Sequence, residues 1–150
     1  MNEGTGGLVL NLEFTLEARP EEVFQKLTEP TELVAWWGPH GFTIPAAEVN
    51  LAVGGRYRFS MTPPDGEPFH LSGEFQEIDA PWRLAYTFRW EEPAPDDQET
   101  LVEISLLNAG DGTRLVLLQG PFRTEERLDL HRNGWTESLE KLRAVLGGRK

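Results

Sequence analysis

The sequence predicts an α+β domain in which a strongly curved antiparallel sheet of about seven strands surrounds a long C-terminal helix. Three observations predict it. Segments in which apolar and polar residues alternate recur along the chain, separated by turns rich in Gly, Pro and Asp. Two short helical patterns follow the first such segment, and a long amphipathic pattern comes last. A curved sheet and the apolar face of a long helix can bury each other.

The first strand and the two short helices are expected in the first 40 residues. The strand covers residues 8–17, and its apolar face carries Leu8, Leu10, Leu12, Phe14 and Leu16. Pro20, followed by two acidic residues, predicts a helix start, because proline is tolerated in the first turn and acids favour the positive end of the helix dipole. A second helix is expected from near Pro30, carrying Trp36 and Trp37, and Gly38-Pro39 should end it.

Six further strands are expected at residues 43–51, 56–62, 69–78, 83–91, 100–108 and 113–120. The turns between most of them carry Gly, Pro or Asp, which supply the backbone angles that hairpins need. Residues 91–99 form a longer connection with five acidic side chains and no basic one. We expect an exposed, mobile loop there. A calcium site is less favoured, because calcium loops space their ligands more regularly.

The C-terminal helix is predicted by its cap and its apolar stripe. Thr124 can cap it, Glu125 and Glu126 fall in the first turn, and Gly147-Gly148 with the basic Arg149 and Lys150 supplies an end signal. The stripe carries Leu128, His131, Trp135, Leu139, Leu142 and Leu146. More than 20 residues give roughly 30 Å of helix. Gly134 costs this helix about 1 kcal/mol relative to Ala, which predicts a close packing contact or a slight kink beside Trp135.

Composition excludes several classes of function. The chain has 14 basic and 25 acidic residues, a net charge of −11, which argues against nucleic acid as a partner. No cysteine is present, so disulfides, thiolate metal sites and cysteine nucleophiles are excluded. Neither a signal peptide nor a membrane-spanning stretch is visible. We therefore expect one cytoplasmic domain over residues 1–150, with no membrane partner, as a monomer or weak homodimer.

Large side chains on the inward faces are the candidate ligand contacts. They are Trp36, Trp37, Phe42, Tyr57, Phe59, Phe75, Tyr86, Phe88, Trp90, Ile104, Leu117, His131, Trp135 and Leu139. Either they fill a solid core, or the sheet and the helix stay apart and leave a cavity for a small hydrophobic or aromatic molecule. Composition alone leaves both interpretations open.

The sequence assigns no reaction. It contains no Gly-x-Ser-x-Gly, P-loop or dinucleotide-binding pattern, so no catalytic residue is named and no cofactor is expected. Burial could still make Tyr57, Tyr86, His131 or Glu74 a general acid or base. A lone histidine such as His131 on an apolar stripe is more often a hydrogen-bonded core residue than a proton carrier. The histidines lack metal-ligand spacing, so no metal site is expected.

Several short motifs, in a fixed order, carry a resemblance to a known family. They are Trp36-Trp37-Gly38-Pro39, Gly41-Phe42, Val53-Gly54-Gly55-Arg56-Tyr57-Arg58-Phe59, Asp65-Gly66, Gly73-Glu74-Phe75, Glu77-Ile78, Gly112-Thr113-Arg114-Leu115 and the stretch from His131 to Trp135. From about Leu12 to Leu146 the chain resembles homologues of the heat-shock-protein ATPase activator (AHSA-type), within the SRPBCC or START-like helix-grip superfamily. One departure is that Asn50-Leu51-Ala52 stands where an acidic residue usually precedes the Val-Gly-Gly turn.

The resemblance implies a helix-grip fold, in which internal cavities are common. Binding or sequestration of a small hydrophobic or aromatic ligand, lipids included, is therefore the first hypothesis. A cyclase-like or hydrolase-like enzyme acting on a ligand in the cavity is the second. The third is a stress-related protein-interaction or co-chaperone-like module, in which Trp36 and Trp37 form an exposed hot spot for a protein partner. Activators of that kind carry an additional chaperone-binding domain that this sequence lacks.

Overall fold

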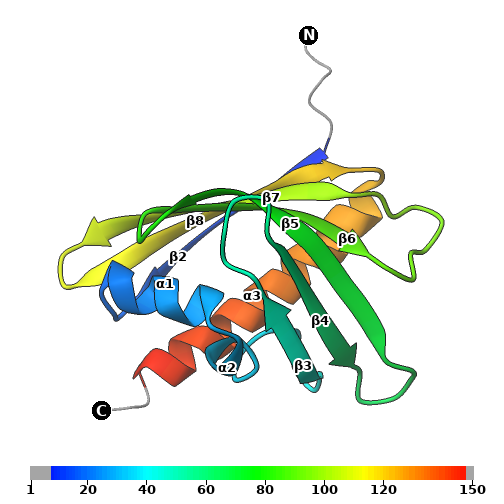
Figure 1. The fold of residues 1–150 in the computed structure, drawn as a ribbon, viewed down its shortest axis with the longest axis horizontal. Coiled ribbons are helices and arrows are strands. Elements are labelled where there is room, and N and C mark those ends of the chain that lie inside the picture. The colour runs from blue at the N-terminus through cyan, green and yellow to red at the C-terminus, as the bar shows by residue number, and fades with distance from the viewer. Residues whose placement is uncertain (1–7, 148–150) are drawn as a thin grey trace, which may run out of the picture.

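The computed structural model describes residues 8–147 and confirms the predicted architecture (Figure 1). The order of elements is β2 (Leu8–Leu16), α1 (Pro20–Thr28), α2 (Pro30–Leu33), β3 (Thr43–Val49), β4 (Arg56–Thr62), β5 (Phe69–Asp79), β6 (Arg83–Trp90), β7 (Thr100–Ala109), β8 (Gly112–Phe122) and α3 (Glu125–Gly147). The expected end signal at residues 148–150 lies outside the described residues.

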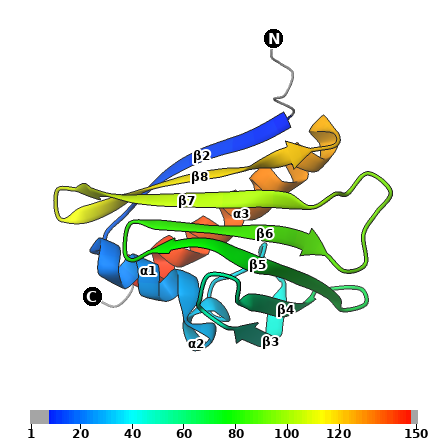
Figure 2. The same ribbon diagram turned by 45° about the horizontal axis from the view of Figure 1, so that its top comes forward.

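All seven strands form one antiparallel sheet in the order β2-β8-β7-β6-β5-β4-β3. Strands β3 to β8 follow one another as a meander, and β2 joins at the side of β8. Figure 2 shows β2 and β3 at opposite edges, and both views show α3 running beneath the curved sheet with α1 and α2 near its C-terminal end. This is the helix-grip fold, a curved sheet closed over its terminal helix.

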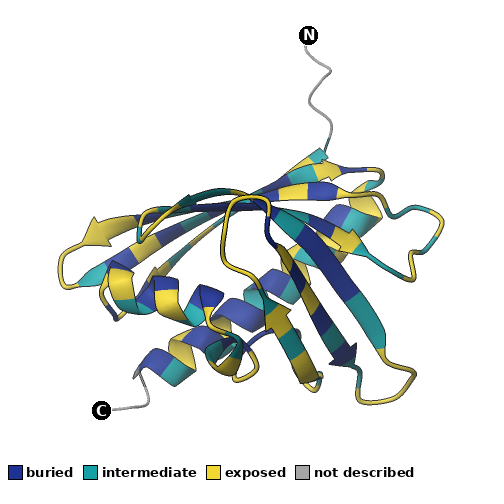
Figure 3. Ribbon diagram, viewed as in Figure 1, coloured by how far each residue is buried: buried dark blue, intermediate teal, exposed yellow. Residues whose placement is uncertain are grey.

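Helix α3 begins and packs as its sequence predicts. The Thr124 hydroxyl accepts a hydrogen bond from the backbone N–H of Arg127 at 3.1 Å, which confirms the cap. Leu128, Trp135, Leu139, Leu142 and Leu146 are buried, and His131 is half-buried. The predicted stripe is therefore the buried side of the helix, and Figure 3 shows buried, intermediate and exposed positions alternating along α3.

Strands β5 and β6 approach each other unusually closely at Gly73. A Cβ atom there would lie 1.9 Å from the carbonyl oxygen of Thr87, a distance that no side chain can adopt. The Tyr57 hydroxyl donates a hydrogen bond of 2.6 Å to the same carbonyl. Gly73 is thus required by the close approach of two backbones, and the Tyr57 hydroxyl fastens β4 to β6 across β5.

The tryptophan pair after α2 lies inside the molecule. Helix α2 ends at Leu33, shorter than expected, and a turn carries the two residues, with the N–H of Trp37 bonded to the carbonyl of Leu33 at 2.9 Å. Trp36 is 0% exposed and Trp37 is 7% exposed. The expectation of an exposed aromatic hot spot was therefore wrong, because the turn directs both indoles into the core.

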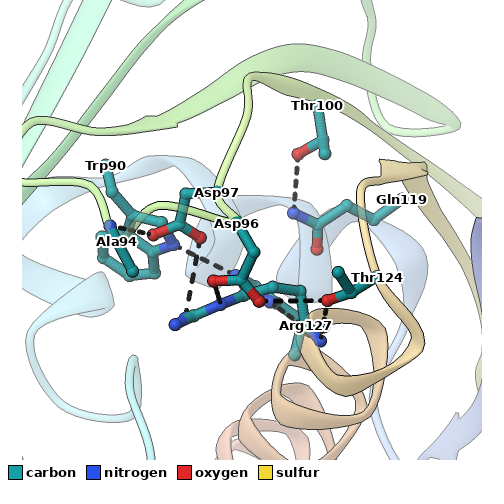
Figure 4. Close-up of polar contacts among 9 residues, drawn as sticks. Trp90, Ala94, Asp96, Asp97, Thr100, Gln119, Thr124 and Arg127 are labelled. Carbon is teal, nitrogen blue, oxygen red and sulfur yellow. Dashed lines mark hydrogen bonds and ion pairs between the residues drawn. The ribbon is translucent and has the colours of Figure 1, made fainter.

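The acidic connection between β6 and β7 is mostly exposed, as its composition predicts, but two of its acids are held by contacts with α3. Arg127 of α3 pairs with Asp96 at 2.9 Å and with Asp97 at 3.6 Å, and the Asp97 side chain is only 9% exposed. Asp97 also accepts a hydrogen bond from the N–H of Ala94 at 2.8 Å (Figure 4). Arg127 lies on α3, 31 residues after Asp96 in the chain, so the charges within the loop alone could not predict these ion pairs. They hold the loop against α3.

Within residues 8–147, no helix is both long and apolar enough to cross a membrane.

Candidate functional site

A cavity of about 310 Å³ lies at the N-terminal half of α3. Its walls come from α3, from residues 37–42, from β4, β5 and β6, and from the loop after β6. Six aromatic side chains line it: Trp37, Phe42, Phe69, Phe88, Trp90 and Trp135. Its polar lining includes Glu92, Asp97, Arg127, His131 and Ser138. The cavity is thus an apolar chamber with a few polar groups, the usual composition of a small-molecule site.

A second cavity of about 20 Å³ lies on the other side of Trp37, which is the one described residue that lines both. Tyr57, Phe59, Phe75 and Tyr86 are among its walls. A space of this size holds about one water molecule. Their rings pack against one another, with Tyr57 and Phe75 5.7 Å apart and Tyr57 and Tyr86 5.2 Å apart. This end of the sheet is therefore nearly solid.

The fourteen candidate contacts are divided among three environments. Trp37, Phe42, Phe88, Trp90, His131 and Trp135 line the large cavity, and Trp36, Trp37, Tyr57, Phe59, Phe75 and Tyr86 line the small one. Ile104, Leu117 and Leu139 line neither and lie in the close-packed core, at most 1% exposed. Strand alternation and the helical stripe of α3 direct many of these side chains inward, but the curvature of the sheet decides which of them face open space.

Sequence reasoning missed several lining residues that share one helical face. Arg127, Gly134 and Ser138 line the cavity beside His131 and Trp135. Their spacing of three or four residues places them on the same side of α3, so helical periodicity could have identified them. The contacts from the loop, Glu92, Ala94 and Asp97, had no comparable signal, because only the tertiary pairing with Arg127 brings the loop to the cavity.

The hydrogen bonds of His131 fix its protonation state. Its Nδ1 lies 2.8 Å from the carbonyl oxygen of Arg127, which can only accept, so Nδ1 carries the proton. The indole Nε1–H of Trp90 can only donate, and it lies 3.1 Å from Nε2 of His131, which therefore accepts. Burial lowers the pKa of His131, which keeps the ring neutral. Both nitrogens are occupied, and His131 serves as a hydrogen-bonded core residue.

A chain of buried hydrogen bonds links Trp135, in the cavity wall, to Gln119 and Thr100. The indole N–H of Trp135 donates to Oε1 of Gln119 at 2.7 Å, and Nε2 of Gln119 donates to the hydroxyl of Thr100 at 2.9 Å. Figure 4 shows the hydrogen bond between Gln119 and Thr100. Gln119 is 0% exposed. Because buried polar groups are costly when unpaired, this chain fixes the orientation of the Trp135 ring in the cavity wall.

The other candidate acid–base groups do not line the large cavity. Tyr57 and Tyr86 lie at the small cavity, and burial raises the pKa of both hydroxyls well above 10.0, so both stay protonated. Glu74 lines neither cavity, so its carboxylate does not face a ligand in either space.

Three possible metal ligands come together around Glu92, which also lines the cavity, although the spacing of the histidines in the sequence predicted no metal site. Ligand atoms of His70, Glu91 and Glu92 lie within 4.8 Å of one another. Glu91 accepts two hydrogen bonds of 2.9 Å from Arg58, and Glu92 lies 2.8 Å from Nδ1 of His70, which lowers the pKa of Glu92. The carboxylates are thus already paired with protein groups.

The fold and the site define a helix-grip domain, a class that comprises ligand-binding and co-chaperone-like modules. The family model "Activator of Hsp90 ATPase homolog 1-like protein" matches residues 17–147, and the chain belongs to this family. No curated protein matches the chain.

Solved structures of bacterial proteins are similar over nearly the whole chain. A protein of Chromobacterium violaceum is 26% identical with a TM-score of 0.85, over 92% of this chain and 96% of the other. An AHSA1 protein of Silicibacter pomeroyi is 28% identical with a TM-score of 0.83, over 95% and 99% of the two chains. A protein of Nitrosomonas europaea is 27% identical with a TM-score of 0.81, over 95% and 96%.

Proposed function

We propose that this protein binds a small, mainly apolar or aromatic molecule in the large cavity and does not transform it. The observation that carries the proposal is the aromatic-lined space of about 310 Å³ between α3 and the sheet. Small-molecule sites are concave, mainly apolar and lined by aromatic side chains with a few polar groups, and this cavity has that composition. A ligand of matching shape would bury the aromatic lining from solvent.

The size of the cavity favours a compact ligand. Small-molecule sites span roughly 300–1,000 Å³, and this cavity lies at the lower end of that range. The space suits a molecule of one or two rings better than a long-chain lipid. The general expectation of lipid binding is therefore narrowed to compact aromatic molecules.

Gly134 supports a cavity that is kept open. A Cβ atom at this position would meet only Cγ of Pro39, at 3.8 Å, an ordinary contact. The close contact expected from the sequence is therefore absent around Gly134 in the described part of the chain. Helix α3 gives up about 1 kcal/mol by having Gly where Ala would fit. The benefit of the glycine is the space in front of it, which belongs to the cavity.

The polar groups around the cavity support binding rather than turnover. Both ring nitrogens of His131 are occupied, and the charge of Arg127 is paired with Asp96 and Asp97. Acid–base catalysis needs a group that can exchange a proton with the ligand. Neither residue offers one without breaking these contacts.

The test is binding to protein freed of co-purified molecules. A library of one-ring and two-ring aromatic compounds, with a fatty-acid arm, is screened by tryptophan fluorescence and amide chemical shifts. Trp37, Trp90 and Trp135 line the cavity, so a bound ring should change both signals. Gly134→Leu fills the cavity and should abolish the response, whereas Asn133→Leu on the exposed neighbouring position should leave it intact. The absence of any response at about millimolar ligand, or an equal response in Gly134→Leu, would overturn the proposal.

A further inference from the structure

Three indole N–H groups belong to residues that line the cavity, and they differ in one respect. Trp90 donates to His131 at 3.1 Å, and Trp135 donates to Gln119 at 2.7 Å. Nε1 of Trp37 is buried and has no hydrogen-bond partner among residues 8–147. Buried donors are nearly always satisfied, so an unpaired one indicates a missing acceptor.

The surroundings of Trp37 restrict where that acceptor can come from. Its ring packs edge-on against Trp36 at 5.7 Å, Phe59 at 5.3 Å and Trp135 at 4.8 Å between centroids. None of these rings offers a lone-pair acceptor, and an aromatic face receives an N–H only in a weak contact. Of the two cavities that Trp37 separates, only the larger has room for more than about one water molecule.

The charges at the cavity indicate that the acceptor is uncharged. Glu92 and Asp97 line the cavity together with Arg127, whose guanidinium is already paired with Asp96 at 2.9 Å and with Asp97 at 3.6 Å. The acids outnumber the base, and the whole chain carries a net charge of −11. A carboxylate ligand would be repelled and would lose its hydration on entry.

We propose that the ligand is an uncharged aromatic compound of one or two rings with a carbonyl oxygen that accepts a hydrogen bond from Nε1 of Trp37. This inference rests on the proposed function and specifies its ligand class. The rings occupy the aromatic chamber, and the carbonyl supplies the acceptor that the protein lacks at Trp37.

The experiment uses three naphthalenes of nearly equal shape: 2-acetylnaphthalene, 2-isopropylnaphthalene and 2-naphthoate. Affinities are measured for wild type, Trp37→Phe and Trp36→Phe. Trp36 is the matched control, because its indole N–H is already bonded to the carbonyl of Lys26 at 3.0 Å. The preference for the ketone over the hydrocarbon should fall about tenfold in Trp37→Phe and stay unchanged in Trp36→Phe.

A second readout needs no variant. The indole N–H resonance of Trp37 in wild type should move downfield with the ketone and much less with the hydrocarbon. The inference would be overturned if Trp37→Phe kept the preference for the ketone over the hydrocarbon and the indole N–H resonance of Trp37 did not move. That result would show that the Trp37 N–H has another acceptor, such as one water molecule in the small cavity. Tighter binding of 2-naphthoate would overturn it in favour of Arg127 as an anion anchor. If none of the three binds at about millimolar concentration, the inference is overturned, and the compound library then decides separately whether the proposed function fails.

Discussion

Substitutions of Gly134 can test whether the stability of helix α3 and the binding of a ligand in the cavity change independently. Because a Cβ atom here meets only Pro39 at 3.8 Å, alanine fits without strain. The helix propensity of alanine then raises the free energy of unfolding of Gly134→Ala by about 0.8–1.0 kcal/mol. For a chain of 150 residues this corresponds to an increase in Tm of about 2–4 °C.

Leucine at the same position adds four carbon atoms, and they enter the cavity. Leucine retains nearly the helix propensity of alanine, and full burial of its side chain contributes a further 1.5–3 kcal/mol or so. Gly134→Leu should therefore be at least as stable as Gly134→Ala, while its affinity for two-ring ligands falls more than tenfold. Stability and binding change in opposite directions, which distinguishes a filled cavity from a damaged fold.

Thermal and urea unfolding, followed by circular dichroism, measure the first effect, and fluorescence titration measures the second. Asn133→Leu is the control, since this exposed neighbour gains helix propensity without reaching the cavity. A lower Tm for Gly134→Ala would refute the reasoning, because it would show that the backbone itself requires glycine. Full ligand affinity in Gly134→Leu would refute the placement of the ligand.

Three further predictions concern the packing around the site. Burial lowers the pKa of His131 below 6.5 in the folded protein, so below about pH 6.5 the unfolded chain binds more protons than the folded one. The Tm should therefore decline as the pH falls below about 6.5. The decline should be smaller in His131→Gln, and an equal decline in this variant would contradict the prediction. Gly73→Ala forces a Cβ to within 1.9 Å of the Thr87 carbonyl oxygen and should cost more than about 4 kcal/mol, measured as loss of soluble, cooperatively unfolding protein; a normal urea transition would contradict it. Gln119→Leu leaves the Trp135 N–H without its acceptor and should lower the free energy of unfolding by about 1–3 kcal/mol in urea titrations. An unchanged midpoint would count against the buried polar chain.

The sequence predicted the elements well because their signals are local. Alternation from Leu8 to Leu16, turn residues between the strands, and the stripe of α3 each depend on neighbours within a few positions. The Thr124 cap is local in the same sense, and the structure confirms it. Long-range order followed because successive strands of a meander pair with each other.

The cavity could not be located from the sequence, since its position depends on how far the curved sheet stands from α3. Phe88 and Ile104 look equivalent as inward strand residues, yet Phe88 lines the open space and Ile104 lies in the solid core. Contacts between distant segments were equally invisible. Arg127 holds the acidic loop, and Gln119 orients Trp135, through side-chain pairs that no local pattern encodes.

The two segments that wall the cavity, residues 38–42 and 92–97, connect regular elements and belong to none of them. Changes in such connections cost a domain little, because the ladder of strands and the far half of α3 hold the architecture without them. The part of the cavity wall that these two segments supply is therefore separable from folding, whereas Trp37 and the wall formed by the strands and α3 belong to the core. Exchanging the two segments should reshape the cavity while the sheet and the helix keep the fold.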